Sequence, residues 1–318
     1  MNIAFLTEGN YAGKVPRTNA NRTDGAWICA LNATHHYIYD KNIPNYDLGI
    51  FIIPKRCDEN FDIRLWTNWF DENLRHKFGK IAVMQEGPND GWLDWTLECQ
   101  TAYMNFIAGQ CDLIFCHNEI DKNYYAGFFT GKQVEILPTL LIEDSINQSS
   151  LRRPENRSGV MIGGNMCQWY GGMDSLNIAM QIGGEIYVPS MGRKQDGEEA
   201  IIGLTHLSYM NWTNWMTELS KRKYAVHLMR TYAAGTFNLN CAHLGIPCIG
   251  YNQCDSQRIC FPELSVNEGD LLEARRIAKH LAENDQFYNH VSLYAKKAWK
   301  DNYSEEIFLK KFNGYFEN

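Results

Sequence analysis

The sequence predicts an α/β protein of two units, each built around a parallel β-sheet. Short runs of β-branched and aromatic residues alternate with longer amphipathic stretches along the chain. The runs are almost continuously apolar, as strands are when helices cover both faces of a parallel sheet. The alternation stops at a polar stretch, residues 143–158, and then begins again. The length of 318 residues also fits two domains of about 150 residues each.

In the first half, strands and helices alternate in the way that predicts a Rossmann-like unit. Turn residues bound each apolar run, and the stretches between runs have the spacing of amphipathic helices. The predicted strands span residues 3–7, 36–39, 48–53, 80–84, 113–116 and 134–137, and the predicted helices span 24–32, 62–77, 92–108 and 119–128.

The second half repeats this alternation and predicts a second Rossmann-like unit, followed by a helical tail. The tail, residues 287–315, predicts two helices with a break near Asn302 and no strand between them. The predicted strands of the second half span residues 159–162, 185–188, 200–204, 224–229 and 247–250, and its helices span 173–182, 211–220, 235–244 and 270–283.

Composition excludes several classes of protein. No window reaches the roughly 18 apolar residues of a membrane span, so we expect a soluble, cytoplasmic protein without a membrane partner. The formal net charge of −7 counts against a nucleic-acid binder with a broad basic face. Ten cysteines are present without a Cys-x-x-Cys pair, which favours reduced thiols over a metal or disulfide framework. We therefore expect no metal site.

Ligands of open α/β sheets bind beyond the carboxyl ends of the strands, so residues at these ends are candidates for chemistry. Glu86 follows the fourth strand before a Gly-Pro turn, where partial burial would suit a general base. Asp24, at the start of the first helix, is the competing carboxylate. The alternative is that Glu86 caps the next helix or pairs with an arginine.

Three cations lie close together after the first strand. Lys14, Arg17 and Arg22 outnumber the acids of this segment and form a candidate acceptor-binding loop, with a solvated surface loop as the alternative. The segment lacks Gly-x-Gly-x-x-Gly, so nicotinamide or flavin chemistry is unsupported. His117, after the fifth strand, is a second candidate contact to the acceptor, with a helix-capping or core histidine as the alternative. Its neighbour Cys116 points to the opposite face of the strand, which argues against a Cys-His nucleophile pair.

Glycine turns follow two strands of the second half. Gly163 and Gly164, with Asn165, follow its first strand, and Gly235 opens a helix after the strand around residues 224–229. Glycines let main-chain amides approach a phosphate, and a helix N-terminus adds a favourable dipole. The sequence therefore predicts an anion site here.

The segment from Met229 to Ile249 resembles the nucleotide-sugar site of GT-B glycosyltransferases. In that family a strand leads to a Glu-Gly-Phe-Gly turn and to a helix ending in Glu-Ala-x-Ala-x-Gly-x-Pro, and Gly235, Gly245 and Pro247 match in register. Tyr232 and Asn240 replace the paired glutamates. Asn240 would therefore take over the contact to the donor ribose.

The Arg and Lys that often clamp the diphosphate in this family are also replaced, by Gly164 and Tyr170. The resemblance implies substitute cations near the strand ends. The resulting candidate donor-binding residues are Gly163, Gly164, Asn165, Arg193, Lys194, Arg230, Gly235, Thr236 and Asn240.

The resemblance extends over the layout of nearly the whole chain. Within the GT-B fold, Asp24, Glu86 and the Ile162-Gly-Gly-Asn turn are also similar to phage β-glucosyltransferases that modify hydroxymethylated bases in DNA, in which an aspartate at the place of Glu86 is the base. The resemblance implies two Rossmann-like domains facing a cleft. Residues 1–142 would bind the acceptor, residues 143–300 the nucleotide-sugar, and residues 301–318 would form a helix crossing back to the N-terminal domain.

The resemblance implies transfer of a sugar from a nucleotide-sugar, here a UDP-sugar as co-substrate, to an acceptor hydroxyl. No Asp-x-Asp pair occurs, so we expect transfer without a metal or other cofactor. Two acceptor classes stay open, a hydroxymethylated pyrimidine in duplex DNA and a glycan or small metabolite. Two other functions stay open for the same fold. The protein would then be a nucleotide-sugar epimerase or hydrolase, or a non-catalytic binding protein. If the protein is phage-encoded, it acts in the host cytoplasm.

Overall fold

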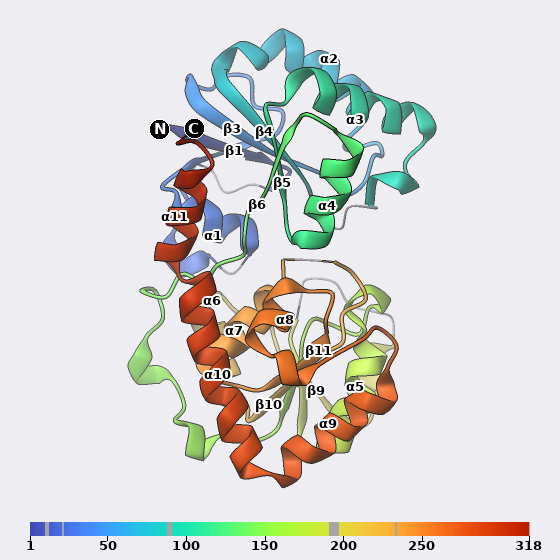
Figure 1. Ribbon diagram of the computed structural model, residues 1–318, viewed down its shortest axis with the longest axis vertical. Helices are drawn as coiled ribbons and strands as arrows, with labels where there is room; N and C mark the ends of the chain where they lie inside the picture. The colour runs from blue at the N-terminus through green and yellow to red at the C-terminus, as the bar shows by residue number, and fades with distance from the viewer. Residues whose placement is uncertain (10–12, 21, 88–90, 191–196, 233, 318) are drawn as a thin grey trace. The chain divides into compact units, whose positions relative to one another are not determined.

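A computed structural model describes residues 1–9, 13–20, 22–87, 91–190, 197–232 and 234–317. The chain divides into two compact units, each containing one six-stranded sheet whose paired strands all run parallel (Figure 1). The first unit comprises Met1–Pro16, Asp24–Pro138 and Phe312–Asn318, and the second comprises Arg17–Thr23 and Thr139–Lys311. This confirms the predicted fold class.

The first sheet has the strand order β2-β1-β3-β4-β5-β6. Its helices α2 and α3 lie side by side over one face (Figure 1). Trp66 and Phe70 of α2 pack against Phe51 of the sheet, and Phe106 of α3 packs against both of them. The strands are β1 (Ile3–Thr7), β2 (Thr34–Tyr37), β3 (Tyr46–Ile53), β4 (Phe78–Gln85), β5 (Leu113–Cys116) and β6 (Gln133–Ile136), and the helices are α1 (Thr23–Ala30), α2 (Ile63–Asn73), α3 (Leu97–Gln110) and α4 (Glu119–Phe128).

The second sheet has the order β12-β11-β10-β7-β8-β9, so the direction of chain progression reverses between β7 and β10. Its strands are β7 (Val160–Ile162), β8 (Ile186–Val188), β9 (Leu204–His206), β10 (Tyr224–His227), β11 (Cys248–Tyr251) and β12 (Ser265–Val266). Its helices are α5 (Gly172–Ile182), α6 (Trp212–Leu219), α7 (Thr236–Leu244), α8 (Asp255–Cys260), α9 (Leu271–Glu283) and α10 (Asp285–Tyr303).

Several helices begin where a polar side chain caps them. Asp62 accepts a hydrogen bond from the Arg64 amide at the start of α2, and Thr96 accepts one from the Cys99 amide at the start of α3. Such a cap satisfies an otherwise unpaired amide and contributes about 1 kcal/mol. Asn118, Asn211, Asp270 and Asn284 do the same for α4, α6, α9 and α10.

The C-terminal helix α11 (Glu305–Gly314) carries the chain back to the first unit. Phe312 is 1% exposed and stacks on Phe115 of β5, with ring centroids 6.1 Å apart. The Tyr315 hydroxyl donates to the Ile136 carbonyl of β6 at 2.6 Å. These contacts confirm the expected return of the last helix to the N-terminal sheet.

The structure corrects the prediction for the strand at residues 200–204. Residues Glu198–Ala200 form a 3-10 helix, and the strand is β9, whose Leu204 pairs with Ile186 of β8. The apolar run that suggested an earlier start contains Ile202, which is 98% exposed, and Gly203, whose φ of 82° does not fit a strand. The short elements α8 and β12 were not predicted. None of the helices among the described residues is both long and apolar enough to cross a bilayer. No disulfide joins any of the ten cysteines, all of which lie in the described part of the chain.

Gly171 provides a test of how closely the second unit packs. Its φ is 62°, and a Cβ there would lie 1.7 Å from the Leu228 carbonyl oxygen. Gly197 is also in the left-handed region, with φ 78° and ψ 4°, but a Cβ there would meet nothing within 4 Å. We expect Gly171→Ala to lower the free energy of unfolding by about 3 kcal/mol or more, and Gly197→Ala by about 1 kcal/mol. Equal losses in urea unfolding would show that backbone strain alone, and not the close approach, makes Gly171 necessary.

Candidate functional site

The second sheet has a topological switch point between β7 and β10, where doubly wound folds bind ligands. The two strands pair through Val160–Tyr224, Met161–Ala225 and Ile162–Val226, so their carboxyl ends lie side by side. The Gly163 amide donates to the Val226 carbonyl at 2.8 Å and holds the loop after β7 against β10. The predicted Gly163–Asn165 turn therefore lies at the switch point.

The glycines of this turn are required by close packing. A Cβ on Gly163 would lie 2.5 Å from Cγ of His227, and Gly164 has a φ of 73° with the Tyr170 ring 2.7 Å from its Cβ position. Asn165 is 1% exposed, and its side chain accepts a hydrogen bond from the Cys167 amide at 3.1 Å. The Asn165 side chain thus holds the conformation of the loop. Because the two glycines have no side chains, the loop main chain can pack closely against His227 and Tyr170.

Two helices begin beside this turn. The N-cap of α5 is Gly171, which packs against Leu228 just after β10, and the N-cap of α7 is Gly235 with φ 75°. A Cβ on Gly235 would lie 2.0 Å from Oγ of Ser256, whose hydroxyl donates to the Gly235 carbonyl at 2.9 Å. The first amides of a helix have no partner within the helix, so each of these two helix starts offers amide donors and the positive end of the helix dipole, as an anion site requires.

Arg230 follows β10 and is held by the first turn of α5. Its Nε and Nη2 donate to one carboxylate oxygen of Asp174 at 3.0 and 2.6 Å, and the Tyr251 hydroxyl donates to the same oxygen at 3.2 Å. The hydrogen bond from Arg230 to Asp174 raises the pKa of Arg230 above its ordinary value. The cation is therefore fixed beside the start of α5, and sequence reasoning did not identify Asp174 or Tyr251.

The side chains of Thr236 and Asn240 lie in internal contacts of the second unit. The Thr236 hydroxyl is 2.7 Å from that of Thr23 and 3.3 Å from that of Thr139. Asn240 is 3% exposed, and the amide orientation that satisfies its neighbours accepts from Nε1 of Trp215 and donates to the Thr236 carbonyl, each at 3.0 Å. Asn240 thus anchors the first turn of α7.

In the first unit, Glu86 directly follows β4, and His117 directly follows the neighbouring strand β5. Glu86 is half-buried, and its amide donates to the Ile53 carbonyl at 2.9 Å. The His117 ring stacks on Trp27 at 5.8 Å and hydrogen-bonds to the main chain of Gln85. Burial lowers the pKa of His117 to about 4, and its Nδ1 has no hydrogen-bond partner among the described residues. His117 is therefore a neutral ring beside the loop that carries Glu86.

Asp24 lies in the first turn of α1 and is half-buried. It influences a histidine that sequence reasoning missed, His35 of β2, which is 2% exposed and contacts the Thr7 hydroxyl through Nε2 at 2.9 Å. Burial lowers the pKa of His35 to about 4, and the charge of Asp24 opposes this shift. His35 lies on the edge strand β2 and Asp24 on α1, whereas Glu86 follows the central strand β4.

The predicted basic residues divide between the two units. Exposed Lys14 belongs to the first and donates to the Asn32 side chain at 2.6 Å, whereas Arg22, also exposed, belongs to the second. Arg17 of the second unit forms ion pairs with Asp144 at 2.9 Å and with Glu305 at 2.6 Å. Its guanidinium thus stabilises the fold of its own unit. Arg193 and Lys194 lie outside the described residues.

His227, the last residue of β10, is a further feature that no sequence motif marked. It is 4% exposed, its Nδ1 contacts the Asn238 side chain at 3.2 Å, and its Nε2 finds no partner in the described part of the chain. Burial lowers the pKa of His227 to about 4. A neutral imidazole ring therefore packs directly against Gly163.

No protein-family model and no curated protein matches this sequence. Solved structures of glycosyltransferases do match over nearly the whole chain. HepE from Anabaena, in complex with UDP, is 10% identical with a TM-score of 0.69, covering 99% of both chains.

Two other solved structures have the same arrangement. The sucrose-phosphate synthase of Thermosynechococcus elongatus is 12% identical, with a TM-score of 0.65 over 99% of this chain and 98% of that one. An alpha-glucosyltransferase in complex with UDP and a 13-mer DNA containing an HMU base is 10% identical, with a TM-score of 0.65 over 99% of this chain and 98% of its own. The chain therefore has the GT-B fold of these glycosyltransferases.

Proposed function

We propose that this protein is a glycosyltransferase that moves a sugar from a nucleoside-diphosphate sugar, a UDP-sugar, to an acceptor hydroxyl. The observation that carries the proposal is the β7/β10 switch point, where a glycine turn, two helix N-termini and a fixed arginine meet. A diphosphate needs main-chain amides and a cation in this arrangement. UDP in the HepE structure, which has the same fold, supports the choice of nucleotide.

The donor diphosphate would bind against Gly163–Asn165, the Gly235–Thr236 helix start and Arg230. Negative charge develops on the phosphate oxygens as the nucleotide departs, and preorganised amides stabilise it without reorganisation. The proposed transfer uses no Mg²⁺ or Mn²⁺ at the diphosphate, since the sequence has no Asp-x-Asp pair. Arg230 supplies the positive charge instead.

Glu86 is the proposed base that takes the proton of the acceptor hydroxyl, and Asp24 is the competing carboxylate. Glu86 fits better because it stands at the carboxyl end of the central strand β4, half-buried, with neutral His117 on the adjacent strand. His117 would contact the acceptor.

The acceptor we propose is a hydroxymethylated pyrimidine in duplex DNA. The complex of the alpha-glucosyltransferase with DNA containing an HMU base supports it, as do the exposed cations Lys14 and Arg22. The net charge of −7 and the ion pairs of Arg17 favour a second candidate, a glycan or small metabolite.

Replacing Glu86 tests the chemistry. Glu86→Gln keeps the shape but cannot accept a proton, so we expect kcat to fall by about 1,000-fold with unchanged UDP affinity. Sugar transfer is measured with a panel of UDP-sugars, and UDP binding by calorimetry. Glu59→Gln, an exposed change in the same unit, should leave both unaltered. Substantial turnover by Glu86→Gln would assign the base to another group, with Asp24→Asn the next variant.

Replacing Arg230 tests the donor site. Arg230→Gln removes the fixed cation, and we expect UDP to bind about 10-fold more weakly, which is about 1.4 kcal/mol. The matched control is Arg276→Gln, because Arg276 forms a similar two-bond ion pair with Glu273 on α9. If both variants bind UDP as the unmodified protein does, the diphosphate does not contact Arg230.

The salt dependence of acceptor binding separates the two acceptor classes. Contacts to DNA phosphates release counterions, so the affinity for hydroxymethylated duplex should fall by about 10-fold or more between 50 and 200 mM salt. Lys14→Gln should reduce that slope. Binding that does not change with salt, or no binding at low salt, would exclude DNA and leave the glycan or metabolite.

A further inference from the structure

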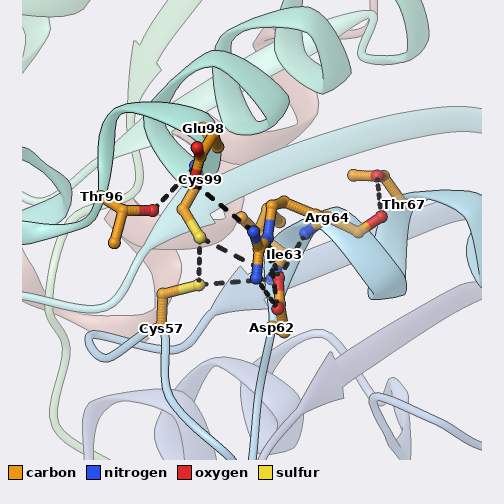
Figure 2. Close-up of polar contacts among 8 residues, drawn as sticks. All are labelled: Cys57, Asp62, Ile63, Arg64, Thr67, Thr96, Glu98 and Cys99. Carbon is orange, nitrogen blue, oxygen red and sulfur yellow. Dashed lines mark hydrogen bonds and ion pairs between the residues drawn. The ribbon is translucent and has the colours of Figure 1, made fainter.

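Two cysteines and an aspartate from two segments of the first unit, the loop between β3 and α2 and the start of α3, lie close together (Figure 2). Cys57 lies in the loop after β3, Asp62 is the N-cap of α2, and Cys99 lies in the first turn of α3. The two sulfurs are 3.1 Å apart, and Sγ of Cys99 is 3.9 Å from Oδ1 of Asp62. Their three ligand atoms all lie within 4.8 Å of one another.

These distances are close to those around a zinc ion. Tetrahedral zinc with Zn–S bonds of about 2.3 Å and Zn–O bonds of about 2.1 Å holds two sulfurs about 3.8 Å apart and a sulfur and an oxygen about 3.6 Å apart. The sulfurs therefore need to separate by about 0.7 Å, a small rotation of either side chain. Cys99 is buried and Cys57 is half-buried, so solvent can supply a fourth ligand.

The surroundings favour sulfur in the thiolate form once a metal is present. The Ile63 amide, at the first position of α2, donates to Sγ of Cys57 at 3.4 Å, and Cys99 stands in the first turn of α3. Amide donors and helix N-termini stabilise negative charge. Both sulfurs thus lie where the main chain stabilises an anion.

Arg64 completes the charge balance. It holds Asp62 through Nη2 at 2.6 Å from Oδ2 and through Nε at 3.0 Å from Oδ1. Two thiolates and one carboxylate carry three negative charges, which a zinc ion and the Arg64 guanidinium neutralise together. An outer partner that orients a ligand carboxylate is a regular feature of metal sites.

A disulfide would use Cys57 and Cys99 alone. Oδ1 of Asp62 lies 3.9 Å from Sγ of Cys99, and the three ligand atoms lie within 4.8 Å of one another. A metal site uses the carboxylate as well as both sulfurs.

We propose that Cys57, Cys99 and Asp62 bind one zinc ion, with water as the fourth ligand. The ion ties the loop after β3 to the start of α3. The same loop accepts hydrogen bonds from Gln85 at Pro54 and from Trp95 at Lys55, at 3.2 and 3.1 Å. Gln85 directly precedes Glu86, so the zinc ion would steady the loop that packs against the strand end carrying the proposed base, without taking part in the chemistry.

Zinc binding to the full-length protein tests the proposal. The reduced protein, freed of metal by a chelator that is then removed, is titrated with ZnCl₂ against a chromophoric zinc indicator. We expect one zinc per chain, and a sulfur-to-metal charge-transfer band when Co²⁺ is used instead. Cys57→Ser and Cys99→Ser should each weaken zinc binding by about 100-fold and reduce the intensity of the Co²⁺ charge-transfer band. Zinc should raise the Tm of the unmodified protein but not that of these variants.

Asp62→Asn keeps an N-cap for α2 and separates a ligand role from a folding role. It should fold, keep the charge-transfer band and bind zinc more weakly. Cys29→Ser, a change at a half-buried cysteine outside the cluster, should bind zinc normally. The proposal is wrong if the reduced protein takes up no zinc, or if Cys99→Ser binds it as tightly as the unmodified chain. It is also wrong if Cys57 and Cys99 are recovered as a disulfide and the protein binds no zinc after reduction.

Discussion

The close approach of two main chains at the β7/β10 switch point is the constraint on which the donor side depends. The Leu228 carbonyl lies where a Cβ of residue 171 would be, and Met166 lies where a Cβ of residue 172 would be. Only glycine allows α5 to start this near to the end of β10. That start in turn places Asp174, and Asp174 places Arg230. The proposed contact between a diphosphate, a helix N-terminus and a cation therefore follows from main-chain packing.

The sequence was sufficient to predict the fold because both sheets are parallel and covered on both faces. Each strand is a short apolar run and each helix an amphipathic one, so period and turn residues separate them. The prediction failed where an apolar run is not buried, as at Ile202, and where an element is too short to show a period, as with α8 and β12. Such segments are fixed by their neighbours in space.

The candidate site was predictable in position but not in the partners of its side chains. Glycine turns can be recognised in a sequence, since Gly163 and Gly235 each follow a predicted strand and precede a predicted helix. The sequence around Arg17 does not indicate an ion pair with Glu305, far along the chain. The sequence around Asn240 does not indicate a hydrogen bond from Trp215. Cys57 and Asp62 share one loop, but Cys99 lies 37 residues beyond Asp62, and no motif spacing links it to them. Long-range pairing of this kind depends on the folded chain.

The Asp174–Arg230 pair raises the question of how a diphosphate would bind beside a carboxylate. The pair uses Nε and Nη2 of Arg230, whereas a guanidinium has five N–H donors. No residue in the described part of the chain accepts from Nη1, which could donate to a phosphate oxygen, and Asp174, shared with the Tyr251 hydroxyl, fixes the plane of the guanidinium. A fixed guanidinium loses less conformational entropy on binding than a free one. Asp174 would therefore orient the cation, and this offers a physical reason why one arginine after β10 can replace the Arg and Lys missing after β7.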